Sequence, residues 1–132
     1  MSIIKRDDGT LVFFNAIPLD EGAMAEICAW GKPTDLILGH HQHCIDAEPF
    51  REHLSLRAYG PKANQVKLRE RVDLSGTFEE FPNDESIKVA SVPGTKLGEA
   101  VVFVKSGPRL SILFSDVIQN NPPENVPTIF RF

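Results

Sequence analysis

The chain contains only two cysteines, Cys28 and Cys44, and they do not form a Cys-x-x-Cys pair. The sequence therefore indicates neither a disulfide framework nor a zinc ribbon, and we expect both thiols to be reduced. Long apolar runs are also lacking: none reaches the length of a membrane span, and the N-terminus has no apolar signal-peptide core. These absences predict a cytoplasmic protein with no membrane partner.

Positive charge is not in excess either, because 14 lysines and arginines stand against 18 aspartates and glutamates. The formal net charge of -4 argues against a nucleic-acid partner, since such proteins carry a basic surface that neutralises phosphates. With 42% hydrophobic and 24% charged residues, the composition is that of an ordinary globular protein. We expect one domain, residues 1–132, that buries about two thirds of the surface its unfolded chain exposes.

The first part of the chain predicts a hairpin followed by an amphipathic helix. Apolar segments at residues 3–5 and 11–14 flank Asp8-Gly9, a strong hairpin turn. Residues 18–33 begin with acidic side chains and end in a glycine and a proline, which is typical of a helix and its two ends. This helix has an apolar stripe that we expect to face the core, formed by Ala23, Met24, Ile27 and Trp30.

Short strands and helices alternate in the middle of the chain, which favours an α/β layer with parallel strand pairs. The segments expected there are a strand at 36–39, a helix at 47–54, a short strand ending at Gly60 and a polar helix within 61–72. Further strands are expected at 87–92, 99–105 and 109–114, the last two joined as a hairpin by "SGP". The final strand has one strongly apolar face, formed by Leu110, Ile112 and Phe114.

The most informative segment is "LILGHHQHCIDAEPF", residues 36 to 50. In an extended chain His41 and His43 point to the same side, and His40 points to the other. Two imidazoles spaced in this way can reach one metal ion. Zinc needs about three protein ligands at a catalytic site and about four at a structural site, so this pair alone would hold a metal weakly. Cys44 and Asp46 are the local candidates for the remaining ligands.

Each of these residues also has an interpretation without a metal. Asp46 opens the helix at 47–54, where aspartate is a common N-cap. Cys44 fits a small buried apolar group, and His53 fits a solvated position on that helix. The histidine cluster can equally be a polar loop at the end of a strand, so the sequence leaves both interpretations open.

Taken together, these features resemble the metallo-β-lactamase superfamily, in particular an uncharacterised hydrolase-like branch with a degenerate metal site. The order of elements is similar: a hairpin, a helix, a strand leading into a histidine motif, a Pro-Gly loop and a strand ending in aspartate. The first motif of the family is His-x-His-x-Asp-His, and "HQHCID" matches its first two histidines as His41 and His43. Ile45 and Asp46 stand where the family has its aspartate and its third histidine.

Two further motifs of the family have weaker counterparts. A histidine after Pro-Gly is replaced in "VPGTKLGEAVVF" by Thr95, and an aspartate that follows a strand is matched in "LSILFSD" by Asp116. No segment supplies the final histidine of the family. The resemblance therefore implies at most the ligands His41, His43, Asp46 and Asp116, a set that suits a single zinc, iron or manganese ion. A site that binds no metal is the other outcome.

The resemblance also implies a fold of the α/β or α+β class: a partial αββα sandwich with mixed β-sheets and flanking helices, shortened at the C-terminus. If the strands that end at Gly39 and Ser115 are parallel neighbours, His41, His43 and Asp116 emerge at the same carboxyl edge of the sheet. Without the resemblance, the sequence around Asp116 predicts a turn residue or the first residue of a helix.

A shortened sandwich leaves an apolar sheet face or a strand edge uncovered, and such surfaces associate. We therefore expect a homodimer or a higher homo-oligomer that buries the region of the C-terminal strand. This region includes three apolar residues of the last segment, Ile129, Phe130 and Phe132.

Two functions follow from the resemblance, and a third from Cys44. The missing Asp-His pair and Thr95 favour a protein without hydrolase activity that acts as a binding or assembly domain, with a small molecule as one ligand class. The alternative is a metal-dependent hydrolase with a reduced ligand set, acting on an ester, thioester, lactone or phosphoester. The third is a nucleophilic enzyme that uses Cys44 with a neighbouring histidine and needs a lowered thiol pKa.

Overall fold

The computed structural model describes residues 1–42 and 44–118. A five-stranded sheet has the strand order β1-β2-β3-β4-β5, and a three-stranded sheet has the order β6-β7-β8. The larger sheet consists of β1 (Ser2–Lys5), β2 (Thr10–Phe14), β3 (Lys32–Ile37), β4 (Arg57–Gly60) and β5 (Leu74–Thr77). The smaller sheet consists of β6 (Ile87–Ser91), β7 (Ala100–Ser106) and β8 (Arg109–Phe114).

Helices α1 (Glu21–Trp30), α2 (Ala47–Leu54) and α3 (Gln65–Arg69) follow β2, β3 and β4 in the chain, and short 3₁₀ turns lie at Lys62–Asn64 and Phe78–Glu80. β1 and β2 form the expected antiparallel hairpin, whereas β2, β3, β4 and β5 pair in parallel. Each parallel connection carries a helix, which is the usual crossover between parallel strands. Of the helices in the described part of the chain, none is long and apolar enough to cross a membrane.

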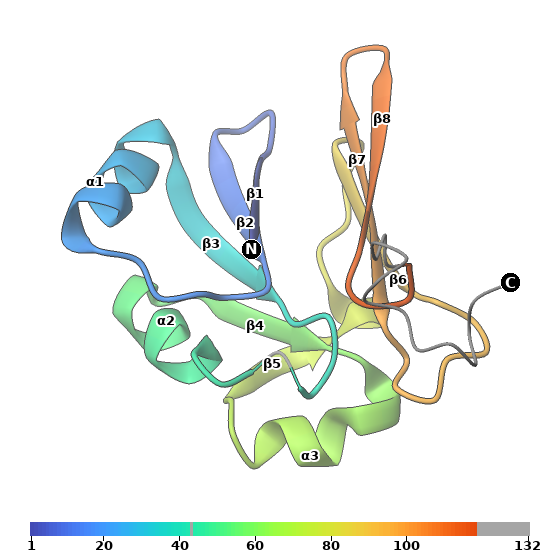
Figure 1. Ribbon diagram of the computed structural model, residues 1–132. Helices are drawn as coiled ribbons and strands as arrows, with labels where there is room; N and C mark the ends of the chain where they lie inside the picture. Colours follow the sequence, from blue (N-terminus) through green and yellow to red (C-terminus); the bar gives the residue numbers. More distant parts are fainter. Residues whose placement is uncertain (43, 119–132) are drawn as a thin grey trace, which may run out of the picture.

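The larger sheet carries apolar side chains on both faces, and β2 and β3 therefore lie buried between two layers. Phe13 and Leu36 belong to the cluster on the helix side, where the rings of Phe13 and Phe50 meet edge to face with centroids 5.1 Å apart. Val12 and Ile37, one position away, belong to the cluster shared with the smaller sheet. The layers are therefore helices, larger sheet and smaller sheet (Figure 1), which is the partial sandwich with mixed sheets that the sequence predicts.

A buried charged group joins the two sheets. Asp35 of β3 has no exposed surface and accepts hydrogen bonds from Arg57 Nε at 2.8 Å and Arg57 Nη2 at 3.1 Å. Arg6 Nη1 lies 3.8 Å from the same carboxylate, and Arg6 Nη2 donates to the Pro82 carbonyl oxygen at 2.9 Å. Arg6 Nε lies 3.2 Å from Asp84 Oδ2, as an ion pair. Arg6 therefore links β3 to the segment that leads into β6.

Three expectations about elements need correction. β3 begins at Lys32 and ends at Ile37 instead of covering 36–39, and β5 occurs where the sequence predicted no strand. Serine and glycine in the middle of "LSGT" hide β5, because both are poor strand formers. The apolar stripe of α1 is only partly covered: Met24 and Ile27 pack against the core, but no residue of α1 is buried and Trp30 is 49% exposed.

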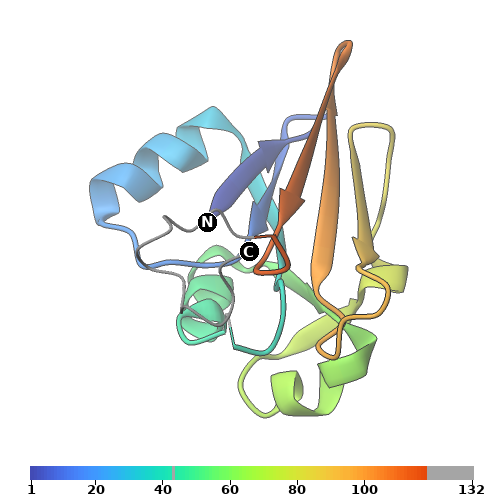
Figure 2. The ribbon, with the colours of Figure 1, turned by 45° about the vertical axis from the view of Figure 1, so that its right-hand side comes forward.

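The apolar face of β8 is present but points outward, since Leu110 is 62% and Ile112 is 46% exposed. Figure 2 shows the hairpin of β7 and β8 extending beyond the rest of the smaller sheet. The three C-terminal residues expected in an oligomer contact, Ile129, Phe130 and Phe132, lie outside the described residues.

Asp84 gives a prediction about acid stability. Partial burial by itself raises the pKa of Asp84, but hydrogen bonds from Ser86 and from the Ile87 backbone N–H, together with Arg6, outweigh it and hold the pKa below the usual 3.8. A lowered pKa stabilises the folded state at pH values above 3.8, and this stabilisation is lost as the pH falls through the folded-state pKa. Because the Asp84 side chain is 40% exposed and solvent screens its charge, we expect Asp84→Asn to lower the free energy of unfolding by at most about 1 kcal/mol at neutral pH. The gap from wild type should shrink below pH 3.8.

Urea unfolding followed across a pH series measures this gap. Glu26→Gln, at an exposed carboxylate of α1, is the control and should differ from wild type by less than about 0.5 kcal/mol at every pH. A gap for Asp84→Asn that stays constant down to acid pH would contradict the assignment of the stabilisation to the charged carboxylate.

Candidate functional site

The candidate site lies where the chain leaves β3 and meets the end of β8. The Gly39 backbone N–H donates to Asn15 Oδ1 at 2.7 Å, and the Gly39 carbonyl oxygen accepts from the Ala100 backbone N–H at 3.0 Å. Asn15 itself adopts a positive φ of 57°, a conformation that asparagine tolerates better than most residues. Gly39 is thus bound both to the end of β2 and to the start of β7, and it fixes where His40 begins.

The absence of a side chain at Gly39 allows the two sheets to meet. A Cβ atom at this position would overlap Ser115 Oγ and lie 2.8 Å from Ser115 Cβ. Real Cβ atoms do not approach other atoms so closely, so only glycine permits the segment after β8 to pass here. Both ribbon views show the end of β8 beside the loop that follows β3 (Figure 1 and Figure 2).

The contact at the centre of the site joins His40 to Asp116. His40 Nε2 lies 2.7 Å from Asp116 Oδ2, with His40 only 1% exposed and the Asp116 side chain 39% exposed. The Gln42 backbone N–H donates to His40 Nδ1 at 3.1 Å, which leaves Nε2 as the nitrogen that carries a hydrogen toward Asp116. The Asp116 backbone N–H in turn donates to Glu99 Oε2 at 3.1 Å. Asp116 is therefore held from two sides.

His41 lies next to this pair but in a different environment. Its ring meets the His40 ring edge to face, with centroids 6.2 Å apart. Burial lowers the pKa of His41 below the usual 6.5, and the positive charge of Lys67, the neighbouring His40 and Arg71 lower it further. Its Nδ1 atom is buried and has no hydrogen-bond partner within the described residues. At neutral pH His41 is uncharged, which is the form of imidazole that binds metals.

Cys44 occupies the core beneath the loop. It is 2% exposed, its Sγ donates to the His41 carbonyl oxygen at 2.7 Å, and Arg71 Nη1 lies 3.9 Å from Sγ. The interpretation as a small buried residue is confirmed. A reactive thiol needs access to its substrate, so this burial disfavours the nucleophilic interpretation.

Thr95 stands at the histidine position of the second family motif and has a structural role. Its hydroxyl group donates to the Val92 carbonyl oxygen at 2.9 Å and accepts from the Glu99 backbone N–H at 3.1 Å. Both bonds close the turn between β6 and β7, next to Gly94, whose φ is +82°. Ile45, at the aspartate position of the first motif, is 80% exposed.

Asp46 takes the position of the N-cap of α2, as predicted, but its side chain makes no capping hydrogen bond. It lines a different hollow, of about 340 Å³, between the start of α1 and α2, where His53 and Phe50 also lie. His53 is exposed, as expected.

The sequence analysis selected His41, His43, Asp46 and Asp116, and the structure brings a different residue to Asp116. The extended geometry that placed His40 on the opposite side does not hold, because the chain turns at 39–42 and directs His40 inward. β3 and β8 belong to different sheets, so the condition of parallel neighbouring strands, on which the shared carboxyl edge rested, is not met. His43 lies outside the described residues.

A metal ion would need more donors than the described residues provide. Within residues 1–42 and 44–118, no group of three His, Cys, Asp or Glu side chains is placed to hold an ion. His41 and Asp116 are two donors, and zinc takes about three from the protein even at a catalytic site. The described residues therefore do not fit such an ion by themselves.

Comparisons with known proteins support the fold. No family model matches the sequence, and no curated protein matches it. Among solved structures, the crystal structure of BLEG-1 B3 metallo-β-lactamase is similar, with a TM-score of 0.52 and 14% sequence identity. The similarity covers 77% of this chain and 60% of that chain, so the protein spans less than two thirds of the length of this neighbour. The chain therefore has a metallo-β-lactamase-like fold.

The close approach at Gly39 can be tested. In Gly39→Ala the new methyl group must displace the Ser115 segment, and we expect a loss of about 1–3 kcal/mol in the free energy of unfolding. Gly22→Ala is the matched control: Gly22 is exposed in α1, its added Cβ would meet only Asp20 Oδ1 at 3.3 Å, and no loss is expected. Urea unfolding of both variants measures the difference, and equal stabilities would show that the segment is not held against Gly39.

Proposed function

We propose that this protein is a metallo-β-lactamase-like domain without hydrolase activity, acting in binding or assembly. The observation that carries the proposal is that positions 45 and 95, where the family motifs have metal ligands, hold Ile45 and Thr95. The hydrogen bond between His40 and Asp116, at 2.7 Å, takes up only one acceptor position of the carboxylate and is compatible with either function.

Neither of these two positions supplies a metal ligand. The Thr95 hydroxyl group donates one hydrogen bond and accepts another within its own turn, so its ordinary hydrogen-bonding capacity is used there. Ile45 has no donor atom and is 80% exposed. Hydrolysis by a metal depends on a bound water whose pKa is lowered to about 7, and neither residue can hold the metal or orient that water.

A metal-dependent hydrolase remains the second candidate because of His41. Its imidazole is uncharged at neutral pH, and its Nδ1 atom is buried without a partner among the described residues. Together with His43 and Asp116 it would form a reduced ligand set of two histidines and one carboxylate, which suits zinc, iron or manganese. Its substrate would be an ester, a thioester, a lactone or a phosphoester.

Metal content separates the two candidates. Untagged protein is analysed for metals after purification and after incubation with zinc, manganese and ferrous iron, followed by removal of free ions. We expect far less than one ion per chain in the wild type, and the same low value in the double variant His41→Ala, His43→Ala. The control is His53→Ala, which removes an exposed histidine of α2 that lies outside the segment with His40, His41 and His43.

About one tightly held ion per chain that the double variant loses, while His53→Ala keeps it, would overturn the proposal. It would also select the four ester-type substrate classes for activity assays. Turnover by the wild type that disappears in the double variant would overturn the proposal in the same way.

A further inference from the structure

The outer face of the smaller sheet is a second surface that the site does not use. Side chains alternate along β7 and β8, so Val102, Val104 and Leu113 pack into the core between the sheets. The residues between them point the other way, and the register pairs Phe103 with Ile112 and Lys105 with Leu110. We define the outer face by the side chains of Lys88, Phe103, Lys105, Leu110 and Ile112.

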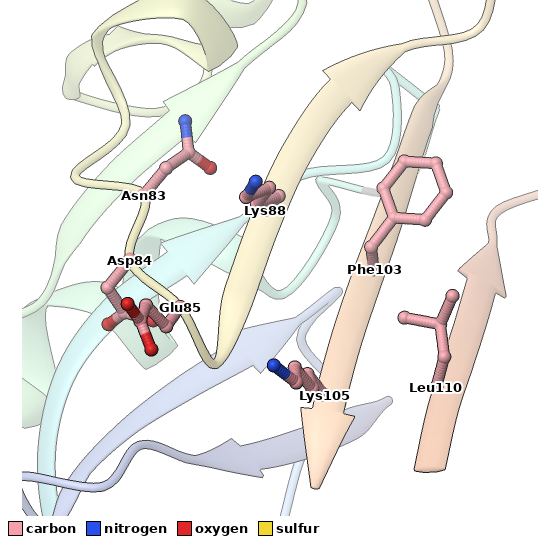
Figure 3. Close-up of a pocket in the computed structure, with 7 residues that line it drawn as sticks. All are labelled: Asn83, Asp84, Glu85, Lys88, Phe103, Lys105 and Leu110. Atoms are coloured by element: carbon pink, nitrogen blue, oxygen red, sulfur yellow. The ribbon is translucent and has the colours of Figure 1, made fainter. Parts of the chain in front are cut away.

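This outer face is both apolar and uncovered by the described residues. Leu110 is 62% exposed, Ile112 is 46% exposed and Phe103 is half-buried. The hollow beside them has a volume of about 590 Å³. Figure 3 shows Phe103 and Leu110 on neighbouring strands at one side of this hollow, with Lys88 and Lys105 between them and the acidic residues Asp84 and Glu85. Large exposed apolar side chains that lie together in this way mark an interaction surface.

β8 adds a second property to the same surface. Within the described residues β8 is an end strand of its sheet, so half of its main-chain polar groups point away from β7. Natural end strands are usually protected by charged side chains, proline or a bulge. In β8 the charged residue is Arg109 at the first position, and residues 110–114 have no charge, no proline and no bulge. The opposite end strand, β6, differs: its Val89 backbone N–H donates to Asn83 Oδ1 at 2.7 Å.

The charges around the hollow indicate which partner fits. Two carboxylates, Asp84 and Glu85, lie at one edge of it, and Lys88 and Lys105 lie between them and the apolar pair Phe103 and Leu110. A surface of a single sign would repel its own copy, whereas a balanced surface can pair with itself about a twofold axis. In such a pair the acidic side of one copy meets the lysines of the other, and the apolar side chains stack between them.

We propose that the outer face of the smaller sheet is the interface of a homodimer, in which it packs face to face on the same surface of a second copy. The inference rests on the proposed role in binding or assembly and names the partner as a second copy of this chain. Sheets that pack face to face lie about 10 Å apart, so Phe103, Leu110 and Ile112 would lose their contact with water in the dimer.

Sedimentation of the full chain over a wide dilution series tests the dimer. The wild type should dissociate from dimer to monomer with dilution, and Ile112→Lys should raise the dissociation constant at least about 30-fold, because it buries an unpaired charge in the interface. The matched control Val66→Lys changes a residue of α3 that is 76% exposed, and it should leave the dissociation constant unchanged. A wild type that is monomeric at every concentration overturns the proposal, and so does a folded Ile112→Lys that dimerises normally.

A measurement on the unmodified chain keeps the test valid if Ile112→Lys fails to fold. Hydroxyl-radical footprinting reads the solvent contact of Phe103, Leu110 and Ile112 at a concentration above the dissociation constant and at one below it. We expect protection only at the higher concentration. Equal labelling at both concentrations overturns the proposal: high labelling means an open face, and low labelling in a monomer means that another part of the chain covers it.

The two proposals fail separately. A monomer that holds no metal overturns the dimer and leaves the non-hydrolytic function standing. A dimer that holds one ion per chain, and loses it when His41 and His43 are changed to alanine, overturns the non-hydrolytic function and leaves the dimer standing.

Discussion

Asp35 is the charge on which the arrangement of the two sheets depends. A carboxylate with no exposed surface is costly unless cations and donors surround it, and here Arg57, Arg6 and Thr34 supply them. Arg57 comes from the neighbouring strand, whereas Arg6 comes from the turn of the first hairpin and reaches on to Pro82 and Asp84. The same buried charge thus sets strand pairing within one sheet and the approach of the other sheet.

The candidate site is a product of that approach, because its residues come from both sheets. Gly39 and His40 follow β3 of the larger sheet, and Ser115 and Asp116 follow β8 of the smaller one. A histidine from one layer and a carboxylate from the other meet only when the layers are correctly placed. The contact therefore has a structural value whatever the loop binds, since it closes this end of the sandwich.

Local signals in the sequence predicted most of the fold and less of the site. Asp8-Gly9 gave the first hairpin, and alternating apolar residues gave β6, β7 and β8. β5 was missed because Ser75 and Gly76 carry no strand signal. The sequence selected Asp116 as a metal ligand, and the structure places it against His40, a contact that depends on a turn at 39–42 and joins residues 76 positions apart. Sequence periodicity carries no information about either.

Thr95 shows why a single substitution could not restore the missing metal ligand at position 95. Its hydroxyl group joins Val92 to Glu99, and Glu99 in turn receives the backbone N–H of Asp116. A histidine introduced at position 95 would supply an imidazole but remove both bonds of the turn, and so loosen the segment that positions the only carboxylate of the third motif. The present threonine is therefore entrenched: any change that adds a metal ligand at position 95 must first rebuild the turn by other means.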